Sequence, residues 1–292
     1  MTYARDDFET LPRIPAWVTS ALAETLEDVA FLSGAALSHL HLVLGRGVVP
    51  QTLLRERLAL CAAEACVAHS GRPERAGELR DAVAFLQLGD QPGPAGEAYL
   101  AWRRAVERPI SVKTLHRAMP GVEAGLIAEW LDVGRGAPVS RAARVLETVL
   151  SDAPREDTVA LILADAALAQ ALGWDHATPV LAAGLKRADL RKSGEELQMA
   201  CHRAVTASGI DAVCMASDLT RRVAHLKAVA PKLRAKGAEE ALEMFLTRDA
   251  VAPAVLSSLN SDRAARRFCD RLAELGAVRE LTGRDTFRLY GI

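Results

Sequence analysis

The arginines near the end of the sequence are the residues with the clearest chemical potential. One short segment carries four of them, at Arg263, Arg266, Arg267 and Arg271. The planar guanidinium of arginine can make two parallel hydrogen bonds to a guanine edge or to a phosphate. Four such groups at this spacing therefore indicate a contact with double-stranded DNA, provided that one element presents them together.

A second group of arginines follows, at Arg279, Arg284 and Arg288. The runs "AVREL" and "TFRLY" flank the turn "TGRD", and two short runs around a glycine-containing loop are typical of a β-hairpin. We expect Arg279 and Arg288 to project from the strands and Arg284 to lie at the tip. Because Phe287 and Leu289 alternate with Arg288, we expect both to pack on the preceding helix.

The element that must position the first group is a helix that begins after Ser261. At about 100° per residue, its arginines fall on one side. The apolar residues fall on the opposite side: Ala265, Phe268, Leu272 and Leu275. Ser261 is a good N-cap, and Gly276 is suited to the left-handed position that ends a helix. The pattern predicts a helix that buries one stripe and exposes its arginines.

The preceding segment, "AEEALEMFLTRDAVAPAVLSSLN", predicts a helix, a short second helix and a turn. Helix, helix, helix, hairpin is the order of a winged helix-turn-helix, whose third helix enters the major groove. We predict this module over residues 237–292, after an all-helical domain over residues 1–236. Arg263, Arg266 and Arg267 would then meet base edges, and Arg284 would touch phosphate or the minor groove.

A different use of the same arginines is equally open. Asp270 and Glu274 lie on their side of the helix and can pair with Arg266, Arg267 or Arg271 at i,i+3 or i,i+4. The helix would then be a solvated, ion-paired face, and winged modules also dock proteins. Two hypotheses follow: a non-enzymatic DNA-binding accessory or regulatory protein, or a protein-interaction subunit in an antitoxin-like or complex-assembly role. In both, the helical domain could bind a protein partner or self-associate; a helical enzyme with an unrecognised site is a third.

A basic run leads into the proposed module. Between Leu219 and Glu239 the sequence has no acid and six basic residues: Arg221, Arg222, Lys227, Lys232, Arg234 and Lys236. This run could add phosphate contacts, or it could be a solvated helix face.

Composition favours a mainly α fold with many helices and a single hairpin. Half of the residues are hydrophobic but only 4% are aromatic, and the dominant Ala and Leu are strong helix formers. Apolar residues recur at helical spacing from Ala16 to Leu44, and "TVALILADAALAQALGW" is apolar enough to be buried on all sides. The net charge of -1 means that any affinity for nucleic acid must come from a local patch.

The other candidate chemistry is weak. The five cysteines have irregular spacings without ligand pairs, so we expect neither a disulfide nor bound zinc. No glycine-rich segment extends into a phosphate-binding fingerprint, and we expect no cofactor and no metal. The start, "MTYARDDFETLPR", lacks the basic and apolar regions of a signal peptide, and no apolar run is long enough for a bilayer. These features predict a cytoplasmic protein without a membrane partner.

Several longer stretches carry a family resemblance. "LRERLALCAAEACVAHSGRPERAGELRDAVAFL", "GDQPGPAG" and "RAARRFCDRLAELGAVRELTGRDTFRLYGI" resemble the bacterial domain-of-unknown-function family 1403, which implies bacterial origin but no activity. Separately, "LGAVRELTGRDTFRLY" is similar to the C-terminal winged helix of some Fic-domain proteins. That resemblance implies a winged fold from about residue 240 onward. The catalytic motif of Fic proteins is absent from the sequence, so AMP transfer is not implied.

Overall fold

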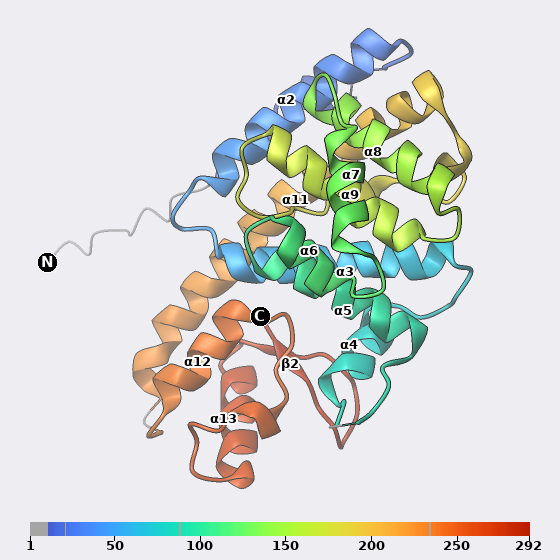
Figure 1. Cartoon of the computed structure of the whole chain (residues 1–292). Helices are drawn as coiled ribbons and strands as arrows, with labels where there is room; N and C mark the ends of the chain where they lie inside the picture. The colour runs from blue at the N-terminus through green and yellow to red at the C-terminus, as the bar shows by residue number, and fades with distance from the viewer. Residues whose placement is uncertain (1–10, 21, 88, 234) are drawn as a thin grey trace, which may run out of the picture.

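The computed structural model of the chain describes residues 11–20, 22–87, 89–233 and 235–292. Helices account for nearly all of its regular structure, and a small sheet lies at the C-terminal end (Figure 1). The prediction of a mainly α fold with one small hairpin is confirmed. Over the described residues, every helix is too short or too polar to cross a membrane.

The first half of the body consists of helices joined by short loops. They are α1 (Ala16–Ser20), α2 (Leu26–Leu44), α3 (Gln51–His69), α4 (Ala76–Ala84), α5 (Gly93–Glu107), α6 (Val112–Ala118) and α7 (Ala124–Asp132). The single helix expected from Ala16 to Leu44 is wrong. Thr25 and Asp28 form a capping box, in which each side chain accepts the other's backbone N–H at 3.0–3.2 Å, so a new helix starts there.

The second half of the body surrounds one buried helix. It contains α8 (Pro138–Asp152), α9 (Asp157–Ala171), α10 (Leu181–Gly184), the 3-10 turn η1 (Asp189–Arg191), α11 (Gly194–Val229) and the 3-10 turn η2 (Ala230–Lys232). Every residue of α9 from Val159 to Ala169 is buried, which confirms that this apolar helix lies inside the body. It packs against α3, α5, α7, α8 and α10.

The long helix α11 is continuous from Gly194 to Val229. Gly209 lies in its middle without breaking it, and a Cβ there would meet Ala36 of α2 at 3.6 Å. The two helices are therefore in close contact at this position, and a Cβ would make an ordinary van der Waals contact there. Because α11 has 36 residues, it extends from the upper body down to the C-terminal helices (Figure 1).

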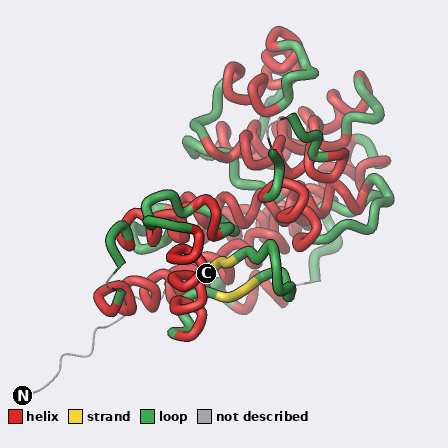
Figure 2. Tube along the Cα trace, turned by 90° about the horizontal axis from the view of Figure 1, so that it is seen from below, coloured by secondary structure: helices red, strands yellow, loops and turns green. Residues whose placement is uncertain are grey.

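The C-terminal segment contains α12 (Ala238–Thr247), the 3-10 turn η3 (Pro253–Val255), α13 (Asp262–Glu274), β1 (Arg279–Glu280) and β2 (Tyr290–Gly291). The strands are antiparallel, with Glu280 opposite Tyr290 (Figure 2). On the other side of Tyr290 lies Val251, and the two residues exchange backbone hydrogen bonds of 2.8 and 2.9 Å. Tyr290 thus lies between two extended segments.

The hairpin differs from expectation at Phe287. Leu289 is buried as expected, but Phe287 is 70% exposed and has a positive φ of 53°. Its ring meets that of Phe85, the residue after α4, edge to face at 5.6 Å. The chain leaves the strand conformation before Leu289, so the alternation assumed for a regular strand does not extend to Phe287.

The body and the C-terminal segment share one continuous hydrophobic core. The same cluster of buried side chains includes Trp102 of α5 and Phe245 of α12, both fully buried. A division of the chain at residue 236 stays a prediction, and the packing of α12 on α3 crosses that boundary.

Candidate nucleic-acid interface

Local signals set both ends of α13 as the sequence predicts. The Ser261 hydroxyl accepts the N–H of Ala264 at 3.2 Å, which satisfies one free donor of the first turn. At the other end, Gly276 has a φ of 67°; its N–H donates to the carbonyl of Ala273, and that of Ala277 donates to the carbonyl of Leu272, each at 2.9 Å. This pair of bonds is a Schellman motif, which ends the helix after Leu275.

The two faces of α13 also separate as predicted. Ala265, Phe268 and Leu272 are buried in the core. On the other face, Arg263, Arg266 and Arg267 are exposed, and none of them forms an ion pair with any described residue. Three guanidinium groups in the first turns of the helix are therefore available to an external anion.

Only one of the two acids on this face forms the ion pair that the alternative hypothesis expects. Glu274 pairs with Arg271 at 2.9 Å, as that alternative expects. Asp270 instead accepts the hydroxyl of Tyr290 at 2.8 Å and lies 3.8 Å from Arg288. Asp270 is thus drawn toward the hairpin, and the acids of α13 neutralise only one of its four arginines.

Arg284, for which the sequence predicts a contact with phosphate or the minor groove, has partners within the protein. It forms an ion pair of 2.6 Å with Asp81 of α4 and lies over the ring of Phe85, 5.8 Å from its centroid. The loop of the hairpin therefore rests on the body. A guanidinium held in this way is a poor candidate for a phosphate contact.

Arg288 is also engaged. Its Nε donates to the carbonyl of Arg284 at 2.8 Å, and its terminal nitrogens lie 3.8 Å from Asp270 and 3.6 Å from Asp285. These contacts stabilise the loop of the hairpin. Arg288 therefore does not extend the cationic face of α13.

Arg279 lies in a different place, beside the basic run of α11. It is exposed on β1 and lines a hollow of about 300 Å³ together with Arg221, Arg222 and His225. Asp218 pairs with Arg221 at 3.0 Å and with Arg222 at 2.6 Å. Burial lowers the pKa of Arg279, and the nearby guanidinium of Arg222 lowers it further. The hollow keeps an excess of positive charge.

The remainder of the basic run is solvated. Lys227, Lys232 and Lys236 are exposed, and Arg234 lies outside the described residues. Sequence reasoning did not connect Arg279 with Arg221 and Arg222, because nothing local to either segment signals the contact between them.

The thiols and other potential metal ligands are dispersed. All five cysteines are free, and Cys66 accepts the indole N–H of Trp102 at 3.3 Å in the core. Among the residues that the structure describes, no three His, Cys, Asp or Glu side chains are grouped so as to hold a metal ion.

One family of known sequences matches the chain. The model of the family described as "Protein of unknown function (DUF1403)" matches residues 2–292, nearly the whole chain. No curated protein matches the chain.

Proposed function

The chain belongs to this family of unknown function, and we propose from its geometry that it is a non-enzymatic, DNA-binding accessory or regulatory protein. In this proposal the segment from α12 to β2 is a winged helix-turn-helix, and α13 is the helix that enters the major groove.

The order and pairing of the C-terminal elements support the winged helix. α12 is followed by Val251, η3, α13, β1 and β2. Val251 pairs with Tyr290 on the side opposite to β1, so three extended segments form a minimal sheet beside α13. A first helix, a short strand, a second and third helix and a hairpin are the parts of this fold, with the second helix reduced to a 3-10 turn.

The observation that carries the DNA-binding proposal is the cationic face of α13. Arg263, Arg266 and Arg267 are exposed in its first turns, where recognition helices meet base edges, and have no ion pair within the described structure. Holding three like charges together without partners costs free energy, and a polyanion would recover it. The hollow around Arg279 offers further phosphate contacts on a neighbouring surface.

The test is salt-titrated binding to random-sequence duplex DNA, followed by fluorescence anisotropy. Binding should weaken linearly in the logarithm of salt concentration, with a slope of about −0.9 per phosphate neutralised. Selection of a preferred sequence should follow. Wild-type protein without salt-sensitive binding to any duplex would end the proposal.

Single substitutions refine the assignment. Arg266→Ala should cost about 1–3 kcal/mol and relax sequence preference if the contact to guanine is bidentate. Arg284→Ala should have little effect on DNA affinity, since its partner Asp81 holds it on the body. Arg117→Ala, which removes an exposed charge from α6, is the matched control and should bind as wild type. Equal losses of DNA affinity in all three variants would show that binding depends only on the overall charge of the protein.

A protein partner is the second candidate, and the hairpin loop favours it. Phe287 is an exposed aromatic side chain at that loop, and the Arg284–Asp81 ion pair holds the loop in place. A rigid loop with an exposed ring suits docking to a protein better than insertion into a minor groove. If duplex DNA does not bind, the arginines of α13 belong to such a protein interface.

A further inference from the structure

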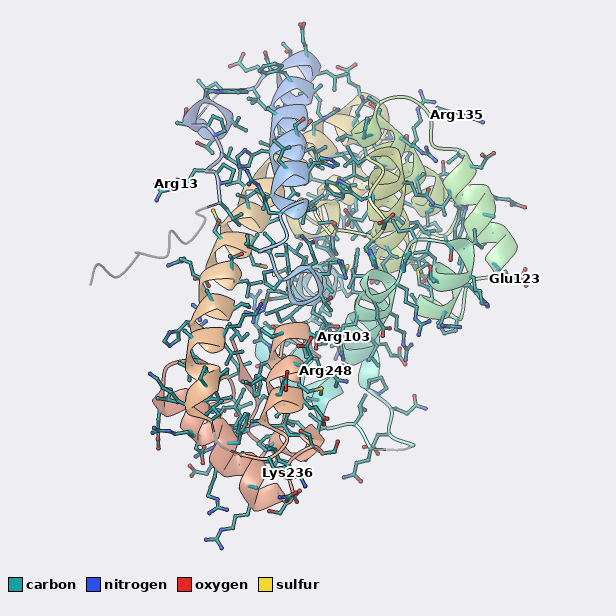
Figure 3. All side chains as sticks on the ribbon, turned by 90° about the vertical axis from the view of Figure 1, so that its left-hand side faces the viewer. Arg13, Arg103, Glu123, Arg135, Lys236 and Arg248 are labelled. Atoms are coloured by element: carbon teal, nitrogen blue, oxygen red, sulfur yellow. The ribbon has the colours of Figure 1, made fainter. Side chains whose placement is uncertain are left out.

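A charged cavity lies where the body meets the C-terminal segment. Its volume is about 120 Å³, and its polar lining comes from α3, α4, α5 and the residue after α12: Glu56, Arg80, Tyr99, Arg103 and Arg248. Figure 3 labels two of these, Arg103 of α5 and Arg248, whose segments are far apart in the sequence. Apolar residues, among them Val83 and Ala252, complete the wall.

The ion pairs around the cavity leave positive charge in excess. Arg103 donates to both carboxylate oxygens of Glu56, at 3.1 and 3.3 Å. Arg80 donates to both oxygens of Asp249, at 2.6 and 3.2 Å, and Arg57 also contacts Asp249. Arg248 has no ion pair with any described residue. The cavity is thus lined by three guanidinium groups and by one carboxylate, that of Glu56.

The paired charges beside the cavity are largely removed from water. The side chain of Asp249 is 1% exposed, that of Arg80 is 13% exposed and that of Arg103 is 29% exposed. Charges that are partly removed from water interact more strongly than charges on the surface. An anion that entered the cavity would therefore be attracted more strongly than an anion beside a single exposed arginine.

Tyr99 supplies a neutral donor beside these cations. It is 3% exposed, and the guanidinium of Arg103 lies 5.6 Å from the centroid of its ring. Burial, together with the carboxylates of Asp249 and Glu56, raises the pKa of Tyr99. The hydroxyl group therefore stays protonated and can donate a hydrogen bond to an anion.

We propose that this cavity binds a small oxyanion, of the size of phosphate or a short carboxylate. Arg248, whose guanidinium forms no ion pair with a described residue, would provide the principal charge, and Arg80, Arg103 and Tyr99 would provide further donors. The volume is well below the roughly 300–1,000 Å³ of pockets for larger ligands, which excludes a nucleotide.

An anion bound in the cavity would strengthen the contact between the body and the C-terminal segment. Arg248 and Ala250 flank Asp249, and Val251, which pairs with Tyr290 of β2, follows directly. An anion held between Arg248 and Arg103 would tie this segment to α5. The bound form is therefore the form in which the C-terminal segment is held most firmly on the body.

The experiment is calorimetric titration of the full chain with inorganic phosphate, against chloride at equal ionic strength. Saturable binding to one site is expected. At tenfold excess over Kd, Tm should rise by about 2–3 °C. Absence of saturable binding to the wild type overturns the proposal.

Two variants locate the site. Arg248→Ala should weaken phosphate binding on the order of tenfold or more, as for loss of a hydrogen bond to a charged group, and Arg248→Glu should abolish it. Both should fold, because Arg248 is exposed and leaves no described ion-pair partner behind. Arg135→Ala, an exposed arginine on the far part of the body (Figure 3), is the charge-matched control. Unchanged binding in the Arg248 variants would overturn the assignment. None of these measurements depends on whether the protein binds DNA.

Discussion

Asp165 shows what a single buried carboxyl group can organise. It lies on α9 with no exposure to solvent, and it accepts the backbone N–H groups of Val180, Leu181 and Ala182 at 3.0, 2.9 and 3.1 Å. These donors belong to the start of α10, where N–H groups lack helical partners. The side chain therefore fixes the 180–182 segment on the central helix.

Removing this acceptor should destabilise the whole body. Asp165→Ala leaves three buried N–H groups unsatisfied and opens a small cavity, so the free energy of unfolding should fall by about 3 kcal/mol or more. Urea unfolding followed by tryptophan fluorescence measures this. Asp211→Ala, at an exposed position of α11, is the control and should change stability by less than about 0.5 kcal/mol.

Asp165 should also make stability depend on pH. Burial raises its pKa from 3.8 to about 7, although its three N–H donors lower it. Between these values the folded chain binds more protons than the unfolded chain, so the free energy of unfolding decreases as pH rises. The contribution is fully present below about pH 4 and is lost as pH rises through 7.

The measurement is the difference in unfolding free energy between the wild type and D165N across this range. From pH 5 to pH 7 the wild type should lose about 2 kcal/mol relative to D165N. A constant difference would show that the pKa of Asp165 is not raised in the folded state.

At the scale of elements, α13 is set by its ends as much as by its faces. Its last turn needs a left-handed residue, and Gly276 supplies it with a φ of 67°. A Cβ at this position would come no closer than 3.9 Å to a neighbour outside its adjacent residues, at His225. The cost of a side chain there is therefore one of backbone conformation rather than of space.

Gly276→Ala should lower the free energy of unfolding by about 1–2 kcal/mol. Gly45→Ala is a matched control, because Gly45 also ends a helix but has a right-handed φ of −72°. Its added Cβ would meet only ordinary van der Waals contacts, at 3.6 Å. Comparable losses in both variants would argue against a conformational origin.

At the scale of the whole molecule, Asp249 joins the C-terminal segment to the body. It is almost completely buried and contacts Arg57 of α3 and Arg80 of α4. Arg57 also donates to the carbonyl of Ile292 at 3.3 Å. Together with the shared core, these contacts predict that both parts unfold in one cooperative transition.

Asp249→Ala should therefore destabilise the chain by about 3–5 kcal/mol, because it removes the buried carboxylate that pairs with the guanidinium groups of both Arg57 and Arg80. All four tryptophans precede residue 237, so their fluorescence reports the unfolding of the body. The midpoint of this signal should shift to lower urea. Glu243→Ala, at an exposed position of α12, should leave it unchanged, and an unshifted midpoint for Asp249→Ala would show that the two parts unfold independently.

The sequence by itself determined the elements whose signals are local. Apolar periodicity and end signals predicted the buried helix α9, and they predicted α13 with its cap at Ser261 and its stop at Gly276. These features depend on residues a few positions apart, so a single sequence contains them. The arginine face of α13 follows from the same periodicity.

Only the tertiary structure decided what those elements touch. Arg284 meets Asp81, and Asp249 meets Arg57 and Arg80, although each pair is separated by more than half of the chain. Arg279 joins the basic residues of α11 in the same way. Contacts of this kind depend on how helices pack around the shared core, and helical periodicity specifies which face is buried but not which neighbour covers it.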